Sequence, residues 1–385
     1  MAAGSPAPRR WTLICRVVDN FGDAAVLWRL ARQLAAEHDA VVRLAIDRVE
    51  VLARLVPGAA AGRTLDGVAI ERLAGDAPLD PVDQTAGAAL AADTDVIVTG
   101  FHARLPAATR ARVGGSGGRR PLLIQLEHLS AEAWVEGCHG LPSPGADGIV
   151  EHFFYPGFSA ATGGLLREAD LAARRAAFAA DPDAARRQLA AVGVARAPGE
   201  HLATLLCYPS APLDALAAAL AASRCRLRLL APHDVLPQPG LAERLQRRSR
   251  GRLALIRIPF VAQRDYDALL WSCDLNFVRG EDSWLRGLWS GRPFLWQAYP
   301  QADAVHHDKL NAFLDRFDPA PPLAAWLEAN RGWNGLAATT PVPALLDQLD
   351  AIAAAIDATT AGWLAAPGNA SDLARRLVEF AEHRL

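Results

Sequence analysis

Strand-like apolar segments alternate with helical segments along almost the whole chain, and this alternation restricts the fold more than any other feature. In the second half, predicted strands recur about every 25 residues, with a helical pattern in each gap. These strands are 202–207, 226–230, 253–258, 275–278 and 294–297. The first half has the same order, with predicted strands at 11–18, 41–46, 68–72, 96–99 and 122–126. Repeated strand–helix units predict parallel, doubly wound sheets, so we expect an α/β protein.

Two such runs in 385 residues predict two α/β domains that face a central cleft. The first domain is expected at 11–165 and the second at 198–360. An alanine- and arginine-rich stretch, 166–197, is expected to be a helical connector. The C-terminal stretch 365–385 has a helical pattern and is expected to cross back to the N-terminal domain. Residues 127–158 contain Pro and Gly without a clear period, which predicts an irregular segment.

The overall composition argues against several kinds of partner. The formal net charge of −2 is unsuited to a broad surface for nucleic acid or an anionic membrane. No apolar run is long enough to span a membrane, and residues 1–10 lack the apolar core of a signal peptide. The five cysteines are scattered without a CxxC pair, which favours reduced cysteines in a cytoplasmic protein.

The motifs of common nucleotide and metal enzymes are also missing. Lys309 is the only lysine, so the chain has no phosphate-binding P-loop. Gly22 belongs to no GxGxxG motif, which argues against a dehydrogenase. Asp93 and Asp95 form a D-x-D, but they precede a predicted strand instead of following one. The histidines show no ligand spacing, so no metal site is predicted.

The segment Arg279-Gly280-Glu281-Asp282-Ser283 is the leading candidate for a binding site. It follows a predicted strand and opens a short amphipathic helix, with Asp282 or Ser283 as the expected N-cap. Helix N-termini at the carboxyl end of a strand bind phosphates in α/β proteins. Arg279, Gly280 and Ser283 suit such a site, whereas the two acids do not suit an anion.

Other loops that follow strands of the second half also carry ligand-type residues. Phe260 and Gln263 follow one strand, where an aromatic ring could stack on a nucleobase and an amide could read a pyrimidine edge. From the residues alone, a core Phe260 at a helix start is an equally good interpretation. Tyr208 follows another strand, and Tyr299 and Gln301 follow a third.

Two carboxylates follow the first strand of the chain. Asp19 and Asp23 are four residues apart across a turn that contains Gly22. This spacing could aim both carboxylates into the predicted cleft at the carboxyl edge of the sheet. Alternatively, Asp19 caps the turn and Asp23 is the N-cap of the next helix. Spacing alone leaves both interpretations open.

Three segments in this order resemble a known family. They are 15–23 (CRVVDNFGD), 132–144 (EAWVEGCHGLPSP) and 279–283 (RGEDS). The chain, from Trp11 onward, resembles the protein-arginine rhamnosyltransferases that modify elongation factor P. The resemblance implies the GT-B architecture, in which two Rossmann-like domains bind the acceptor and the nucleotide sugar. It also implies an inverting, metal-independent transfer from dTDP-β-L-rhamnose, a co-substrate, to one arginine of the protein partner, with no other cofactor.

The same resemblance implies roles for particular residues. Asp23 would be the catalytic base and Asp19 would assist it. The acceptor side of the cleft would also include Asn20, Phe21 and Gly22. Phe260 and Gln263 would hold thymine. The ribose and diphosphate side would be bound by Tyr208, Arg279, Glu281, Asp282 and Ser283.

The chemistry fits these residue types, although other functions remain alternatives. A guanidinium has a pKa above about 12 and is a poor nucleophile. A carboxylate must therefore bind it through charge-assisted hydrogen bonds and accept its proton as the new bond forms. Alternatives are a GT-B glycosyltransferase or sugar-nucleotide epimerase acting on a small-molecule or lipid acceptor. A non-catalytic nucleotide-sugar or translation-factor binding protein is a further alternative, although binding alone would not require both Asp19 and Asp23.

Overall fold

The computed structural model describes residues 9–18, 21–73, 93–101, 103–115, 120–337 and 341–385. The chain divides into two compact units. Unit 1 comprises Met1–Ala169 with Ala366–Leu385, and unit 2 comprises Asp170–Ala365. None of the helices within the described ranges is both long and apolar enough to cross a membrane.

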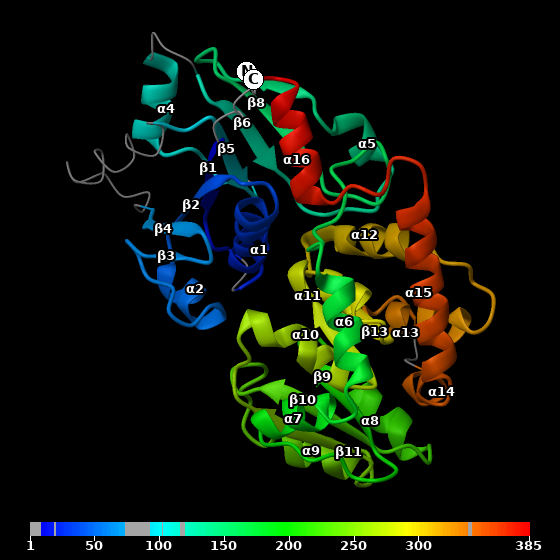
Figure 1. The fold of residues 1–385 in the computed structure, drawn as a ribbon. Helices are drawn as coiled ribbons and strands as arrows, with labels where there is room; N and C mark the ends of the chain where they lie inside the picture. The colour runs from blue at the N-terminus through cyan, green and yellow to red at the C-terminus, as the bar shows by residue number, and fades with distance from the viewer. Residues whose placement is uncertain (1–8, 19–20, 74–92, 102, 116–119, 338–340) are drawn as a thin grey trace. The chain divides into compact units, whose positions relative to one another are not determined.

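Unit 1 contains an eight-stranded sheet in the order β3-β4-β2-β1-β5-β6-β8-β7 (Figure 1). Its strands are β1 (Arg10–Cys15), β2 (Val41–Ile46), β3 (Thr64–Leu65), β4 (Val68–Arg72), β5 (Val96–Gly100), β6 (Leu122–Leu126), β7 (Pro142–Pro144) and β8 (Val150–Phe154). Its helices are α1 (Gly22–Glu37), α2 (Val49–Leu55), α4 (Ala107–Gly115), α5 (Trp134–Cys138) and α16 (Leu373–Glu382). All neighbouring strands pair in parallel except β3 with β4 and β7 with β8. The strand order reverses between β1 and β5, which is the topological switch point of a doubly wound sheet.

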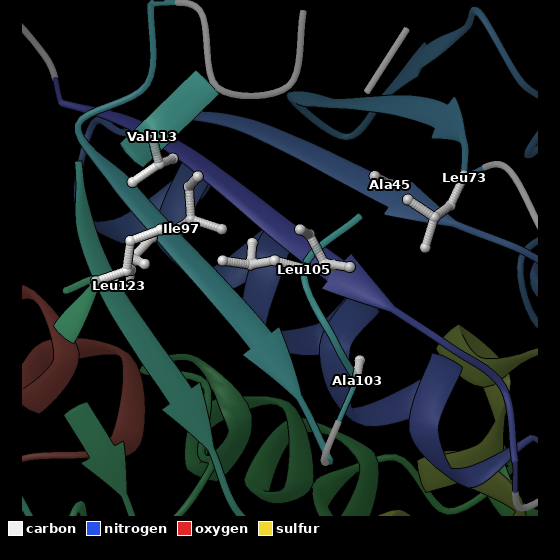
Figure 2. Packing of buried hydrophobic residues seen from close by; sticks show 9 residues of the cluster. Ala45, Leu73, Ile97, Ala103, Leu105, Val113 and Leu123 are labelled. Atoms are coloured by element: carbon white, nitrogen blue, oxygen red, sulfur yellow. The ribbon is translucent and has the colours of Figure 1, made fainter. Parts of the chain in front are cut away.

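The central strands of unit 1 are apolar because helices cover both faces of a parallel sheet. Figure 2 shows one side of this core, where Ile97 and Leu123 of neighbouring strands pack near Val113 of α4. The other side approaches α1 closely at Gly100. A Cβ atom at Gly100 would lie 2.5 Å from Leu27 Cδ1, so a larger residue here would require the Leu27 side chain to move.

Unit 2 contains a five-stranded, all-parallel sheet in the order β11-β10-β9-β12-β13. Its strands are β9 (His201–Leu205), β10 (Leu227–Pro232), β11 (Leu253–Ile258), β12 (Leu275–Arg279) and β13 (Phe294–Gln297). Its helical elements are α6 (Leu171–Ala180), α7 (Ala184–Ala191), α8 (Leu213–Ala221), α9 (Leu241–Arg248), α10 (Gln263–Ser272), α11 (Asp282–Trp289), the 3₁₀ turn Ala302–Ala304, α12 (Val305–Leu314), α13 (Leu323–Trp333), α14 (Val342–Leu346) and α15 (Leu349–Ala365). Here the switch point lies between β9 and β12.

The predicted α/β class with parallel sheets is confirmed, but two local expectations differ from the structure. The segment 166–197, expected to be a helical connector, does contain helices, α6 and α7, but these pack on α10 and are counted with unit 2. The segment 127–158, expected to be irregular, contains α5 and the antiparallel pair of β7 and β8. β7 was not predicted because Pro142 and Pro144 argue against a strand. Proline is tolerated in an edge strand, and β7 lies at the edge of the sheet.

The C-terminal helix α16 is held in unit 1 by main-chain and side-chain hydrogen bonds. The N–H of Leu373 donates to the carbonyl of Leu165 at 3.0 Å. Arg376 Nη1 donates to the carbonyl of Ala160, also at 3.0 Å. These bonds join α16 to the chain that follows β8.

Candidate active site

The switch point of unit 2 brings together the ends of β9, β12 and β13. Arg279 is the last residue of β12, and its Nη1 donates to the carbonyl of Cys207 at 2.7 Å. Its guanidinium lies over the ring of Tyr208, 4.9 Å from the ring centroid. Tyr208 is buried and meets the half-exposed Tyr299 edge-on at 5.3 Å. A cation and aromatic rings therefore meet where doubly wound sheets bind nucleotides.

A buried amide connects these loops. Gln297, the last residue of β13, accepts the main-chain N–H of Tyr208 on Oε1 at 2.7 Å. Its Nε2 donates to Ser210 Oγ at 3.1 Å, and its carbonyl accepts the N–H of Gly280 at 3.3 Å. One residue thus fixes the loop after β9 relative to the loop after β12. Gln297 was not predicted from the sequence, because a glutamine that ends an apolar strand shows no sign of these partners.

The start of α11 differs from the expected cap. The helix begins at Asp282, and its N-cap residue is Glu281, which makes no side-chain capping hydrogen bond. Ser283, expected as a cap, instead binds Arg279: its hydroxyl accepts the Arg279 N–H at 2.9 Å and donates to the Arg279 carbonyl. Gly280 has a φ of 59°, which allows the sharp turn between strand and helix. Ser283 therefore closes the turn and holds the main chain of Arg279 in place.

The loop after β11 leads directly into α10. Gln263 is the first residue of that helix and is 4% exposed, whereas Phe260 is half-buried. Both residues lie at the carboxyl edge of the unit 2 sheet, as their sequence positions predict. β11 is the outermost strand of the sheet, so these residues flank the switch point instead of lining it.

The switch point of unit 1 carries carboxylates. Asp23 lies in the first turn of α1 and is 4% exposed, and its Oδ2 accepts the N–H of Val18 at 2.7 Å. Asp47, which follows β2, accepts the N–H of Val17 at 3.0 Å. Burial, and then the charges of Asp23 and Asp47, raise the pKa of Cys15. Two carboxylates therefore lie beside the end of β1. Asp47, like Gln297, was not predicted from the sequence.

The remaining predicted residues of this loop divide into two groups. Asp19 and Asn20 lie outside the described residues. Phe21 is the N-cap residue of α1 and Gly22 is the first residue of that helix, so Asp23 is not the N-cap. The guanidinium of Arg54 lies over the Phe21 ring, 5.2 Å from the centroid.

Metal ligands and reactive thiols do not form a site in the described ranges. Within those ranges, no group of three or more His, Cys, Asp or Glu residues could hold a metal ion. Asp95, the second aspartate of the D-x-D, accepts the N–H of Arg10, the first residue of β1, at 2.9 Å. Its carboxylate therefore makes a structural contact at the start of a strand. Burial raises the pKa of Cys207 and of Cys273 to about 12, so both remain protonated thiols.

Comparisons with known proteins agree with this geometry. A sequence model of the family described as the elongation factor P (EF-P) rhamnosyltransferase EarP matches residues 11–382. A protein-arginine rhamnosyltransferase of Pseudomonas putida is 42% identical over 344 residues, covering 84% of this chain and 86% of the relative. One of Pseudomonas aeruginosa is 39% identical over 394 residues, covering 96% and 98%.

Solved structures point to the same fold. A structure described as the basis for EarP-mediated arginine glycosylation of EF-P is 30% identical, has a TM-score of 0.58 and covers 98% of this chain and 99% of that chain. A UDP-glucosyltransferase of Polygonum tinctorium is 14% identical with a TM-score of 0.55 and supports the fold alone. The protein is therefore a glycosyltransferase with the GT-B fold. It belongs to the EarP family, the protein-arginine rhamnosyltransferases that act on EF-P.

Proposed function

We propose that this protein transfers rhamnose from dTDP-β-L-rhamnose to an arginine guanidinium of EF-P, with inversion and without a metal ion. The observation that carries the proposal is the buried carboxylate of Asp23. It lies at the switch point of unit 1, accepts the N–H of Val18 and is accompanied at the end of β1 by the carboxylate of Asp47. A carboxylate in such a place suits a cationic acceptor such as a guanidinium.

On the acceptor side, Asp23 accepts the proton that the nucleophile loses. A guanidinium stays protonated at neutral pH, and its lone pairs are delocalised. Charge-assisted hydrogen bonds to a carboxylate localise electron density on the attacking nitrogen. As this nitrogen bonds to the anomeric carbon, its proton passes to Asp23 and the bond from that carbon to the diphosphate oxygen breaks. A single in-line attack inverts the anomeric centre. Asp19 assists in this proposal.

On the donor side, Arg279 stabilises the charge of the departing diphosphate. Its guanidinium is held over Tyr208 and by the Cys207 carbonyl, so it is already oriented before a ligand binds. The main-chain N–H groups at the start of α11 add partial positive charge. Together they supply the stabilisation that a divalent metal provides in other transferases.

The other predicted donor contacts complete the proposal. Phe260 and Gln263 hold the thymine, by stacking and by the paired donor and acceptor of the amide. Glu281 and Asp282 bind hydroxyl groups of the ribose or the sugar, because carboxylates accept hydrogen bonds and repel phosphate. Ser283 contributes through the turn that it closes.

The test combines purified protein, dTDP-rhamnose and EF-P, in buffer with and without EDTA. Mass spectrometry is expected to find one added deoxyhexose on one arginine of EF-P, at the same rate in both buffers. EF-P with that arginine replaced by lysine is the control and should stay unmodified. Absence of the adduct with folded protein would contradict the proposal, and loss of transfer in EDTA would contradict its metal-free part. Transfer only to a small or lipid acceptor would favour the alternative GT-B functions.

A further inference from the structure

A buried ion pair joins the two helices whose first residues are proposed donor contacts. Arg286 of α11 donates from Nε to Asp267 Oδ1 of α10 at 2.7 Å, and its Nη2 donates to Oδ2. The two side chains are 1% and 5% exposed. The contact is a bidentate ion pair between guanidinium and carboxylate, which restricts both the distance and the relative orientation of the two groups. The helices α10 and α11 are neighbours in unit 2 (Figure 1).

The position of the pair in the two helices is symmetric. Asp267 is four residues after Gln263, the first residue of α10. Arg286 is four residues after Asp282, the first residue of α11. Residues four apart lie on the same face, about 6 Å along the helix axis. The ion pair therefore lies one turn behind both helix starts.

Stability alone is a weak reason for this pair. Burying two charges costs about as much as their attraction returns, and apolar pairs of similar volume often serve the fold equally well. Asp267 Oδ2 also accepts Arg174 Nη1 of α6 at 3.1 Å, so one carboxylate holds two guanidinium groups. What the pair provides and apolar side chains lack is a directional link between α10 and α11.

We propose that Asp267 and Arg286 are positioning residues that set the spacing between the base-binding and diphosphate-binding ends of the donor site. The inference rests on the proposed function, in which Gln263 holds the base and the start of α11 holds the diphosphate. A nucleoside diphosphate must reach both ends at once. Binding of the base increases the affinity for the diphosphate only when the spacing between the two ends matches the ligand.

The test compares dTDP with thymidine, which reaches only the base-binding end. Calorimetry measures the dissociation constant of each ligand. The dissociation constant of thymidine divided by that of dTDP reports the gain in affinity from binding both ends. In the double variant Asp267→Leu/Arg286→Met, we expect this ratio to shrink by about 10- to 100-fold, while thymidine binds as in the wild type. Arg286→Lys keeps the charge but loses the fork, so an intermediate loss is expected. That variant also provides the test if the double variant does not fold.

A second, more exposed ion pair in unit 2 supplies the control. Arg175 of α6 binds Asp357 of α15 through two hydrogen bonds of 2.9 and 3.0 Å. Arg175 Nη1 also donates to the carbonyl of Trp289, the last residue of α11, at 3.3 Å. That contact lies at the opposite end of α11 from Asp282, so Arg175→Met/Asp357→Leu should leave the ratio unchanged. An unchanged ratio in the Asp267 and Arg286 variants would overturn this inference alone. A wild-type protein that does not bind dTDP would instead overturn the proposed donor, and this inference with it.

Discussion

Gln297 Oε1 accepts a hydrogen bond of 2.7 Å from the main-chain N–H of Tyr208, so one buried amide joins the end of β13 to the loop after β9. Tyr208 in turn lies under the guanidinium of Arg279. Two residues of the proposed donor site therefore depend on a third that was not expected to take part.

Replacing Gln297 should disturb both stability and donor binding. Gln297→Met keeps the volume but leaves the buried Tyr208 N–H without its acceptor, which should cost about 1–3 kcal/mol of unfolding free energy. The dissociation constant for dTDP should rise about tenfold, because Tyr208 and Arg279 lose their fixed positions. Gln297→Glu keeps the acceptor and should bind dTDP more tightly than Gln297→Met.

The control is Asn276→Leu. Asn276 is a buried amide near the other end of β12, and its Oδ1 accepts a hydrogen bond from Thr204 Oγ1 at 2.8 Å. It should unfold more easily yet bind dTDP normally.

Arg279→Lys should weaken the diphosphate contact. Lysine keeps one charge but loses the planar guanidinium that stacks on Tyr208 and binds two oxygens at once. Calorimetry with dTDP should show a loss of about 10- to 100-fold, the range of a charge-assisted hydrogen bond. Arg196→Lys serves as the control, because Arg196 pairs with Asp274 just before β12 begins. Equal affinity in Arg279→Lys and the wild type would refute the role of the guanidinium.

Glu281→Gln should weaken binding of dTDP-rhamnose, because an amide is a weaker acceptor for a hydroxyl than a carboxylate. We expect a loss of about 1 kcal/mol in binding free energy, the difference between hydrogen bonds to a charged and to a neutral acceptor. Comparison with dTDP identifies the partner: a loss confined to dTDP-rhamnose indicates a sugar hydroxyl, and an equal loss for both ligands indicates the ribose. Unchanged affinity for both ligands would remove Glu281 from the donor site.

His139 should make unit 1 less stable in acid. Burial, and then the charges of Arg376 and Arg384, lower the pKa of His139 from 6.5 to about 4 in the folded protein, while its Nδ1 accepts the N–H of Tyr155 at 3.1 Å. Between about pH 4 and 6.5 the unfolded chain binds more protons at this residue, so stability rises with pH across that window and falls on acidification. Urea titrations should show a loss of up to about 3 kcal/mol from this residue. His139→Asn keeps an acceptor but does not titrate, so its stability should depend less on pH; the same pH dependence as the wild type would contradict the assignment.

The sheets were predictable from the sequence for a simple physical reason. Strands of parallel sheets are largely apolar runs, and β2, β4, β6, β11 and β13 have the bounds that were predicted from such runs. The class of fold and the positions of Arg279 and Gln263 at the carboxyl edge of the unit 2 sheet follow directly from this pattern.

The partners of polar residues were not predictable in the same way. Asp267 and Arg286 look like solvated residues of two separate helices until α10 packs against α11. Gln297 gains its partners only when β13 pairs with β12 and the loop after β9 folds against it. Ser283 was expected to cap α11 because hydroxyls favour that position, but its hydroxyl binds Arg279 instead. Tertiary contacts decide such roles.

The central claim is that Asp23 accepts the proton of the acceptor guanidinium. Asn has nearly the same shape as Asp, and its side-chain oxygen can still accept the N–H of Val18, but it cannot take up that proton. The most direct measurement is the single-turnover transfer rate of Asp23→Asn with saturating dTDP-rhamnose and EF-P, alongside its affinity for dTDP-rhamnose. We predict a rate reduced by about 100- to 10,000-fold with donor affinity within about twofold of the wild type. Transfer by Asp23→Asn at the wild-type rate would contradict the account.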